Sequence, residues 1–220
     1  FAGLHGVPGF YCWHHDRSDR SRRPANLFLP WHRAYLLYFE NALRDQGEGV
    51  TLPWWDWTSD QSHSTGIPDA FAEETAKGQA NPLFSARIFV PTANPPLDRM
   101  TTRQPGDPSQ LPSAGQVDDL ITNHVQFQDF SSQVEDVHDM IHGWTGGDMG
   151  VITTAAFDPI FWSHHCMIDR LWYMWQLKNG VNNVPHAYLN IVLEPFGLKV
   201  SDVLDIHSLG YDYASSSVVI

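Results

Sequence analysis

Two histidines four residues apart are the first feature of this sequence that suggests chemistry. His138 and His142 stand in the segment VEDVHDMIHGW, residues 134–144, whose apolar spacing predicts a helix. Side chains at i and i+4 share one helix face, with Cβ atoms about 5–6 Å apart. Both imidazoles can therefore bind one metal ion, and the spacing alone leaves the metal and its chemistry open.

Further histidines in the N-terminal loop and in two other predicted helices are candidates for the same site. These candidates are His5, His14, His15, His32, His164 and His165. Isolated histidines, such as His63, His186 and His207, are expected to be ordinary core or surface residues.

A zinc protease is the first alternative, because HDMIH resembles the H-E-x-x-H motif. Asp139 stands where that motif has its general-base glutamate, and its side chain is one methylene too short to reach a metal-bound water. This interpretation also leaves the other candidate histidines unused. All-imidazole ligation suits copper, zinc, iron or nickel. Six or more candidates favour two ions, which in two-metal sites lie about 3.5–4 Å apart.

Three predicted helices carry most of these histidines. The first is the segment FLPWHRAYLLYFENALRDQG, which ends at Gly47. The second covers about 130–144, and the third runs from the Asp158-Pro159 pair to Gly180. Residues 60–118 are rich in proline, glycine, serine and threonine, and they predict a long ordered excursion with one short helix in PDAFAEETAKG. The tail from residue 200 is predicted to be strand-like. A mainly α core wrapped in loops is therefore expected.

Length and composition exclude several classes of protein. The 220 residues fit one domain, and 25 acidic against 13 basic residues give a net charge of −12. This charge opposes binding to nucleic acid or to an anionic membrane. There is no apolar run long enough to span a membrane, no recognisable signal peptide, and only two cysteines. The localisation is not predicted. Because a candidate ligand already stands at position 5, we expect the natural N-terminus to lie further upstream.

Two extended motifs resemble those of the type 3 copper proteins, the family of tyrosinases, catechol oxidases and molluscan-type haemocyanins. They are HGVPGFYCWHH followed by FLPWHRAYLLYFE, and VHDMIHGWTGGDMG followed by AFDPIFWSHHCMIDRLW. The resemblance covers almost the whole chain. It implies a four-helix-bundle core that carries a binuclear copper site, wrapped by long loops with few short strands, as a single catalytic domain over residues 1–220.

The resemblance also assigns the ligands. It makes His5, His14 and His32 the ligands of one copper ion, and His138, His142 and His165 those of the other. His164 is then a neighbour of the site. His14 is preferred to His15 because Cys12-x-His14 matches the family's cysteine–histidine thioether crosslink.

Six further residues receive roles from the same resemblance. Asp169 is expected to be a carboxylate that orients a ligand ring, with a helix-surface salt bridge to Arg170 or Arg33 as the alternative. Ile152 is expected to line the substrate pocket. Glu135 and Asp139 are expected to hold a water between them and to act as the base for monophenols. Tyr211 and Tyr213, in GYDY, match a Tyr-x-Tyr motif that closes the catalytic domain of polyphenol oxidases.

The function implied is the copper-dependent oxidation of o-diphenols to o-quinones with reduction of dioxygen. An o-aminophenol is an equal alternative as substrate, and monophenols are expected to be weak ones. The expected partners are therefore a phenolic small molecule and dioxygen, while the oligomeric state is not predicted. Two other classes remain alternatives: reversible dioxygen binding, as in haemocyanin, and a scaffold with a degenerate site.

Overall fold

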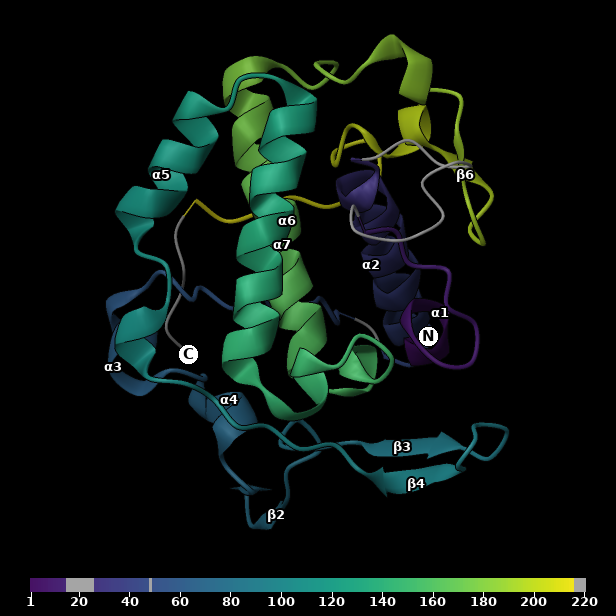
Figure 1. Cartoon of the computed structure of the whole chain (residues 1–220), viewed down its shortest axis with the longest axis vertical. Coiled ribbons are helices and arrows are strands. Elements are labelled where there is room, and N and C mark those ends of the chain that lie inside the picture. Colours follow the sequence, from purple (N-terminus) through teal and green to yellow (C-terminus); the bar gives the residue numbers. More distant parts are fainter. Residues whose placement is uncertain (15–25, 48, 216–220) are drawn as a thin grey trace.

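Four helices that pack on one another form the core of the computed structural model, which describes residues 1–14, 26–47 and 49–215. They are α2 (Phe28–Arg44), α5 (Ala114–Asn123), α6 (Phe127–Thr145) and α7 (Ile160–Asn179). Helices α6 and α7 lie side by side in the centre, with α5 on one flank and α2 on the other (Figure 1). The predicted mainly α fold with a four-helix core is confirmed.

Local sequence signals explain where the central helices begin and end. The Asp158 carboxylate accepts a hydrogen bond of 3.1 Å from the backbone N–H of Ile160 and so caps the start of α7. Gly180, with φ of 94°, ends that helix. Helix α6 ends at Gly146, where φ is 66° and a Cβ would lie 2.5 Å from the carbonyl oxygen of Gln104. Only glycine fits that turn.

Large aromatic side chains fill the space between these helices. Trp31, Trp172 and Trp175 are buried completely, and Phe130 stacks on Trp175 with ring centroids 4.9 Å apart. Burying rings of this size supplies most of the apolar contact area of the core. The packed rings also exclude water from the helix faces that carry the histidines.

The remaining elements are short. The helices are α1 (Ala2–His5), α3 (Asp60–Thr65) and α4 (Asp69–Ala72), with 3₁₀ helices η1 (Pro108–Gln110), η2 (Gly147–Gly150), η3 (Ala155–Phe157), η4 (His186–Tyr188) and η5 (Val200–Val203). The strands form three antiparallel pairs: β1 (Thr75–Ala76) with β2 (Gln79–Ala80), β3 (Arg87–Val90) with β4 (Leu97–Met100), and β5 (Val192–Leu193) with β6 (Leu198–Lys199). The β3–β4 hairpin pairs Ile88 with Arg99 and projects beyond one end of the helices (Figure 1).

The structure differs from the sequence predictions in two segments. The tail was predicted to be strand-like, but residues 200–215 form η5 and turns, because Tyr211 and Tyr213 reach back to Asp169 instead of pairing with a strand. The excursion over 60–118 holds more regular structure than expected, including the β3–β4 hairpin and the start of α5. A readable signal preceded α5, since Ser113 and Gln116 form a capping box.

No helix within the described part of the chain combines the length and the apolar character needed to cross a bilayer.

Candidate binuclear metal site

Six of the predicted histidines form two groups of three at the centre of the helices. The first triad is His5, His14 and His32, and the second triad is His138, His142 and His165. Within each triad, one ligand nitrogen per residue lies within 4.8 Å of the others. The triads are adjacent, because the rings of His32 and His165 stack with centroids 4.6 Å apart. The predicted residues are therefore placed where two neighbouring ions could be held.

Different elements deliver the two triads. His5 is the last residue of α1, His14 lies in the segment that follows it, and His32 lies in the second turn of α2. His138 and His142 share one face of α6, as their spacing predicted, and His165 comes from the neighbouring α7. The packing of α2 and α6 against α7 brings the triads together.

Hydrogen bonds at Nδ1 set the tautomers of several of these rings. Nδ1 of His32 lies 2.9 Å from the carbonyl oxygen of Phe28, and Nδ1 of His142 lies 2.6 Å from that of Met149. A carbonyl oxygen only accepts, so Nδ1 carries the proton in both rings and Nε2 keeps its lone pair. Nδ1 of His138 donates in the same way to Asp139, at 2.9 Å. This pattern is typical of metal-binding histidines, which direct one nitrogen at the ion and bond the other to the protein.

The free nitrogens of the second triad converge with the spacing of ligand atoms. Nε2 of His165 lies 3.2 Å from Nε2 of His138 and 3.4 Å from Nε2 of His142. Around a tetrahedral ion with bonds of roughly 2.0–2.1 Å, ligand nitrogens lie about 3.3 Å apart. In the first triad, Nε2 of His5, His14 and His32 is buried without a hydrogen-bond partner among the described residues. Buried polar atoms need a partner, and one copper ion per triad fits the donors present.

Burial also keeps the ligand rings in the form that binds metals. It lowers the pKa of His5, His32, His138 and His165 well below the usual value, and neighbouring histidines add to the effect. The pKa of His142 falls to about 4 for the same first reason, although its hydrogen bond to Met149 opposes the change. Neutral imidazole is the form that binds a metal ion, so these five rings need to lose no proton first.

His14 is the exception among the six. Burial lowers its pKa, but hydrogen bonds with Cys12 and Glu135 outweigh that effect and raise the pKa to about 9. Nδ1 of His14 lies 3.4 Å from Oε1 of Glu135, a carboxylate that is completely buried. Cys12 is buried as well and is hydrogen-bonded to His14, and the thioether between the two stays a prediction. His15, the alternative to His14, lies outside the described residues.

A cavity of about 310 Å³ connects the triads with the surface. His5, His14, His138 and His142 line it, whereas His32 and His165 do not. The predicted pocket residue Ile152 lies in its wall and is 39% exposed. Gly143 and Gly150 also line the wall and are exposed, so the cavity opens between α6 and η2. A small molecule can therefore approach four of the six histidines from outside.

The two predicted carboxylates occupy different environments. Glu135 lies in the interior beside His14. Asp139 also lines the cavity, but 51% of its side chain is exposed, and it bonds to His138. Glu135 therefore does not belong to a solvated helix face, and each carboxylate orients a histidine of a different triad.

Asp169 departs from its predicted role as the partner of a ligand ring. Its Oδ1 accepts a hydrogen bond of 2.6 Å from Nε of Arg33, and its Oδ2 accepts hydrogen bonds of 2.7 Å from both Tyr211 and Tyr213. Nδ1 of His165 has no hydrogen-bond partner among the described residues. The carboxylate lies one helical turn beyond His165, where it meets the guanidinium of α2. The partner is Arg33, as in the alternative, but the salt bridge is buried and does not lie on the helix surface.

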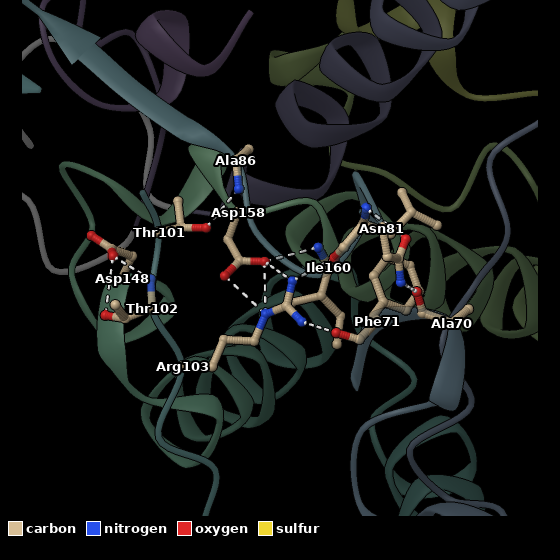
Figure 2. A network of polar contacts seen from close by, with 11 residues as sticks. Ala70, Phe71, Asn81, Ala86, Thr101, Thr102, Arg103, Asp148, Asp158 and Ile160 are labelled. Carbon is tan, nitrogen blue, oxygen red and sulfur yellow. Dashed lines mark hydrogen bonds and ion pairs between the residues drawn. The ribbon is translucent and has the colours of Figure 1, made fainter. Parts of the chain in front are cut away.

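A polar network that the sequence did not reveal fixes the connection between α6 and α7. Figure 2 shows Arg103 against Asp158, with Nε 2.9 Å from both carboxylate oxygens, and against the carbonyl oxygen of Phe71. Asp148 accepts a hydrogen bond of 2.9 Å from the backbone N–H of Thr102 in the same view. This network holds η2, which lines the cavity, and the start of α7 against residues 99–103. Only Asp158 gave a signal in the sequence, as a helix cap.

His164 is also close to the triads, although it belongs to neither. It is completely buried, and its ring stacks on that of His138 with centroids 5.2 Å apart and planes 15° from parallel. The sequence prediction of His164 as a neighbour of the site agrees with this position.

Sequence comparison relates the chain to both tyrosinases and haemocyanins. The sequence model for the common central domain of tyrosinase matches residues 1–178. The chain is 30% identical to tyrosinase from Streptomyces antibioticus over 229 residues, covering 90% of this chain and 82% of that protein. It is also 30% identical to haemocyanin 1 from Megathura crenulata over 214 residues, again covering 90% of this chain but only 6% of that much longer protein.

Solved structures give the same relationship. The fold matches a functional unit of octopus haemocyanin with a TM-score of 0.70 and 27% identity, over 96% of this chain and 58% of that one. It matches tyrosinase from Burkholderia thailandensis with a TM-score of 0.77 and 24% identity, over the whole of this chain and 65% of that one. The chain thus spans about three fifths of these structures, and the second match is evidence of the shared fold alone.

Proposed function

The chain belongs to the type 3 copper family of tyrosinases and haemocyanins, and from this premise we propose that it oxidises o-diphenols to o-quinones. Proteins of this family bind two copper ions. In this proposal the first triad holds one ion and the second triad holds the other. The reaction takes two electrons and two protons from each diphenol, so two diphenols reduce one dioxygen to two waters.

One observation carries the choice of an oxidase: the cavity of about 310 Å³ that leads from the surface to four of the histidines. Its volume lies at the lower end of the range for small-molecule sites, roughly 300–1,000 Å³. Reversible dioxygen binding needs access only for a diatomic molecule, whereas a cavity of this volume has space for a small aromatic ring. Family membership alone does not decide, because tyrosinases and haemocyanins match at equal identity.

The side chains that line the cavity suit a flat phenolic ring. His142 contributes an imidazole ring to the lining, and Ile152 contributes an aliphatic side chain. Gly143 and Gly150, which also line the cavity, have no side chains that would narrow it. A larger side chain at position 152 would cover the histidines, so Ile152 controls which substrates enter.

The bound copper pair supplies the two-electron chemistry, and the residues of the chain manage orientation and protons. Asp139, at the exposed edge of the cavity, can accept a proton from a phenolic hydroxyl and release it to solvent. The hydrogen bonds from His138, His32 and His142 to the protein keep those rings in position throughout the reaction. For a monophenol, which must be deprotonated before it is hydroxylated, Glu135 is the proposed base.

The test is an activity panel on the copper-loaded chain. We expect oxygen consumption and quinone absorbance with catechol, weak turnover of a monophenol, and a ratio of o-aminophenol to catechol turnover that identifies the preferred class. A protein that holds two copper ions and binds dioxygen reversibly, yet consumes no oxygen with catechol, would be a carrier and would refute the proposal.

A pair of variants tests the role of the cavity separately. Ile152→Phe should lower kcat/KM for catechol by blocking the opening, whereas Ile152→Val should preserve it. Copper content should remain at two per chain in both variants. Equal activity of the two would show that substrate reaches the site by another route.

A further inference from the structure

We propose that His14, His138 and Asp139 form a loading position at which a copper ion from solvent is first held before it moves to either triad. This inference rests on the proposed binuclear copper site, and it concerns how that site is filled. The three residues come from both triads and from the surface between them.

Geometry makes these residues a third group of metal donors. One ligand atom from each of the three lies within 4.8 Å of the others, the same criterion that the two triads meet. The carboxylate of Asp139 lies beside the ring of His138, and the rings of His14 and His138 have centroids 5.5 Å apart. Two imidazoles with one carboxylate form a donor set suited to a divalent first-row metal ion.

The three side chains differ in exposure, and this difference sets the order in which an entering ion meets them. The side chain of Asp139 is 51% exposed, whereas those of His14 and His138 are 6% and 1% exposed. All three line the cavity, but His32 and His165 do not. An ion that enters from solvent therefore meets the Asp139 carboxylate before it can reach the deepest ligand of either triad.

The position shares one ligand with each final site. His14 belongs to the first triad and His138 to the second, so an ion held by both already has one ligand of either destination. Exchanging Asp139 and one imidazole for the remaining two histidines of a triad completes the transfer. The hydrogen bond between Asp139 and His138 can then form again and fix the ring of a ligand that has received its metal.

The same helix face offers a matched control for the charge of Asp139. Asp136 is exposed and lies three residues earlier on α6, so it shares that face with Asp139. It belongs to none of the three donor groups and does not line the cavity. Replacing either aspartate by asparagine removes one negative charge from the same surface, but only Asp139→Asn removes a donor.

The experiment follows copper uptake by the metal-free chain, with no substrate present. Stopped-flow mixing with Cu²⁺ is monitored by quenching of the fluorescence of the nine tryptophans, and final copper content is measured separately. Asp139→Asn should slow uptake about tenfold, within the range that a local charge and donor can contribute to association rates. Asp136→Asn should change the rate less than about twofold at physiological salt, where surface charges are screened. Asp139→Glu, which keeps a carboxylate, should retain most of the rate.

Three results would overturn the loading position. Unchanged uptake in Asp139→Asn would show that the carboxylate takes no part. Equal slowing in Asp139→Asn and Asp136→Asn would reduce the effect to the general charge of the helix face. A final content below two copper ions in Asp139→Asn would make Asp139 part of a final site. Failure of the oxidase proposal is separate, because it would appear as two bound copper ions without catechol oxidation.

Discussion

The second triad takes two histidines from adjacent turns of α6 and the third from the neighbouring α7, whereas the first triad takes one histidine from each of three separate segments. Two of those segments are short or irregular, namely α1 and the residues that lead to His14. The second triad is held by long helices and by the network of Arg103 and Asp158 at the start of α7. The first triad depends on side-chain partners such as Cys12 and Glu135.

This difference indicates two ways of preparing a metal site. Regular secondary structure sets the spacing of the second triad, so its Nε2 atoms already converge. In the first triad, the raised pKa of His14 means that a proton must leave before that ring can bind copper. We therefore expect the second triad to be the more prepared of the two, and five predictions test this comparison.

The largest effect should come from removing a ligand. His165→Ala should leave one copper ion per chain and lower catechol oxidation by more than about 100-fold, beyond the effect of residues that only orient a ligand. His5→Ala should also leave one ion, now in the second triad. His63→Ala, outside both triads, is the control. Metal analysis and oxygen uptake are the measurements, and full activity in His165→Ala would contradict the assigned site.

The network behind the second triad gives the next effect. Arg103→Ala should lower the free energy of unfolding by about 3–5 kcal/mol, because it leaves the buried Asp158 carboxylate without its cation. Arg87→Ala removes an exposed pair with Asp98 and should leave the urea midpoint nearly unchanged. Similar midpoints for the two variants would show that the network contributes little.

The pH dependence of the same variant follows from Asp158. Burial raises the pKa of this carboxyl even though Arg103 opposes the change. A carboxyl with a raised folded pKa loses its unfavourable charge as pH falls. The stability difference between Arg103→Ala and the parent chain should therefore shrink as the pH is lowered through that pKa.

Glu135 links the two triads, since it belongs to the helix of the second and contacts a histidine of the first. Glu135→Gln should lower monophenol turnover about 100-fold, the lower range for loss of a general base. Catechol turnover should fall much less. Asp136→Asn, one residue along the chain, serves as the control. Equal losses on both substrates would make Glu135 a residue that only positions His14.

The smallest effect concerns the first triad alone. After exposure to copper and oxygen, mass spectra of the segment GFYCWHHD should show the loss of two hydrogens that a Cys12–His14 thioether requires. Cys166, also buried, should remain a thiol that alkylates on unfolding. Cys12→Ser should weaken copper binding at the first triad by about tenfold at most, as for other ligand-orienting groups. Full alkylation of Cys12 in the active protein would exclude the crosslink.

The same contrast explains how much the sequence could predict. The pair His138 and His142 follows from helical spacing, because local geometry alone brings the rings together. His5, His14 and His32 come together only through tertiary packing, so no spacing rule could group them, and the resemblance to a known family was needed. Caps and periodicity predicted the helices α2, α6 and α7. Helix α5 was not predicted, despite its capping box.

Long-range polar contacts were the least predictable feature. Arg103 and Asp158 are far apart in the sequence, and nothing in the segment around Arg103 indicates its partner. Asp169 was predicted from its position one turn after His165, but helix position does not reveal what packs against that face. Arg33 from α2 takes the carboxylate, and the two tyrosines of the tail complete its hydrogen bonds.

The buried pair of Arg33 and Asp169 has a consequence for how the sequence of this protein can drift over time. Arg33 follows His32 directly, Asp169 lies one turn after His165, and the guanidinium stacks on Trp172 at 3.7 Å. Losing one charge leaves the other buried without a partner. It also loosens α2 and α7, the helices that carry the stacked rings of His32 and His165. In lineages descended from a common ancestor, positions 33 and 169 should therefore be inherited together, and a lineage that has replaced one should have replaced the other.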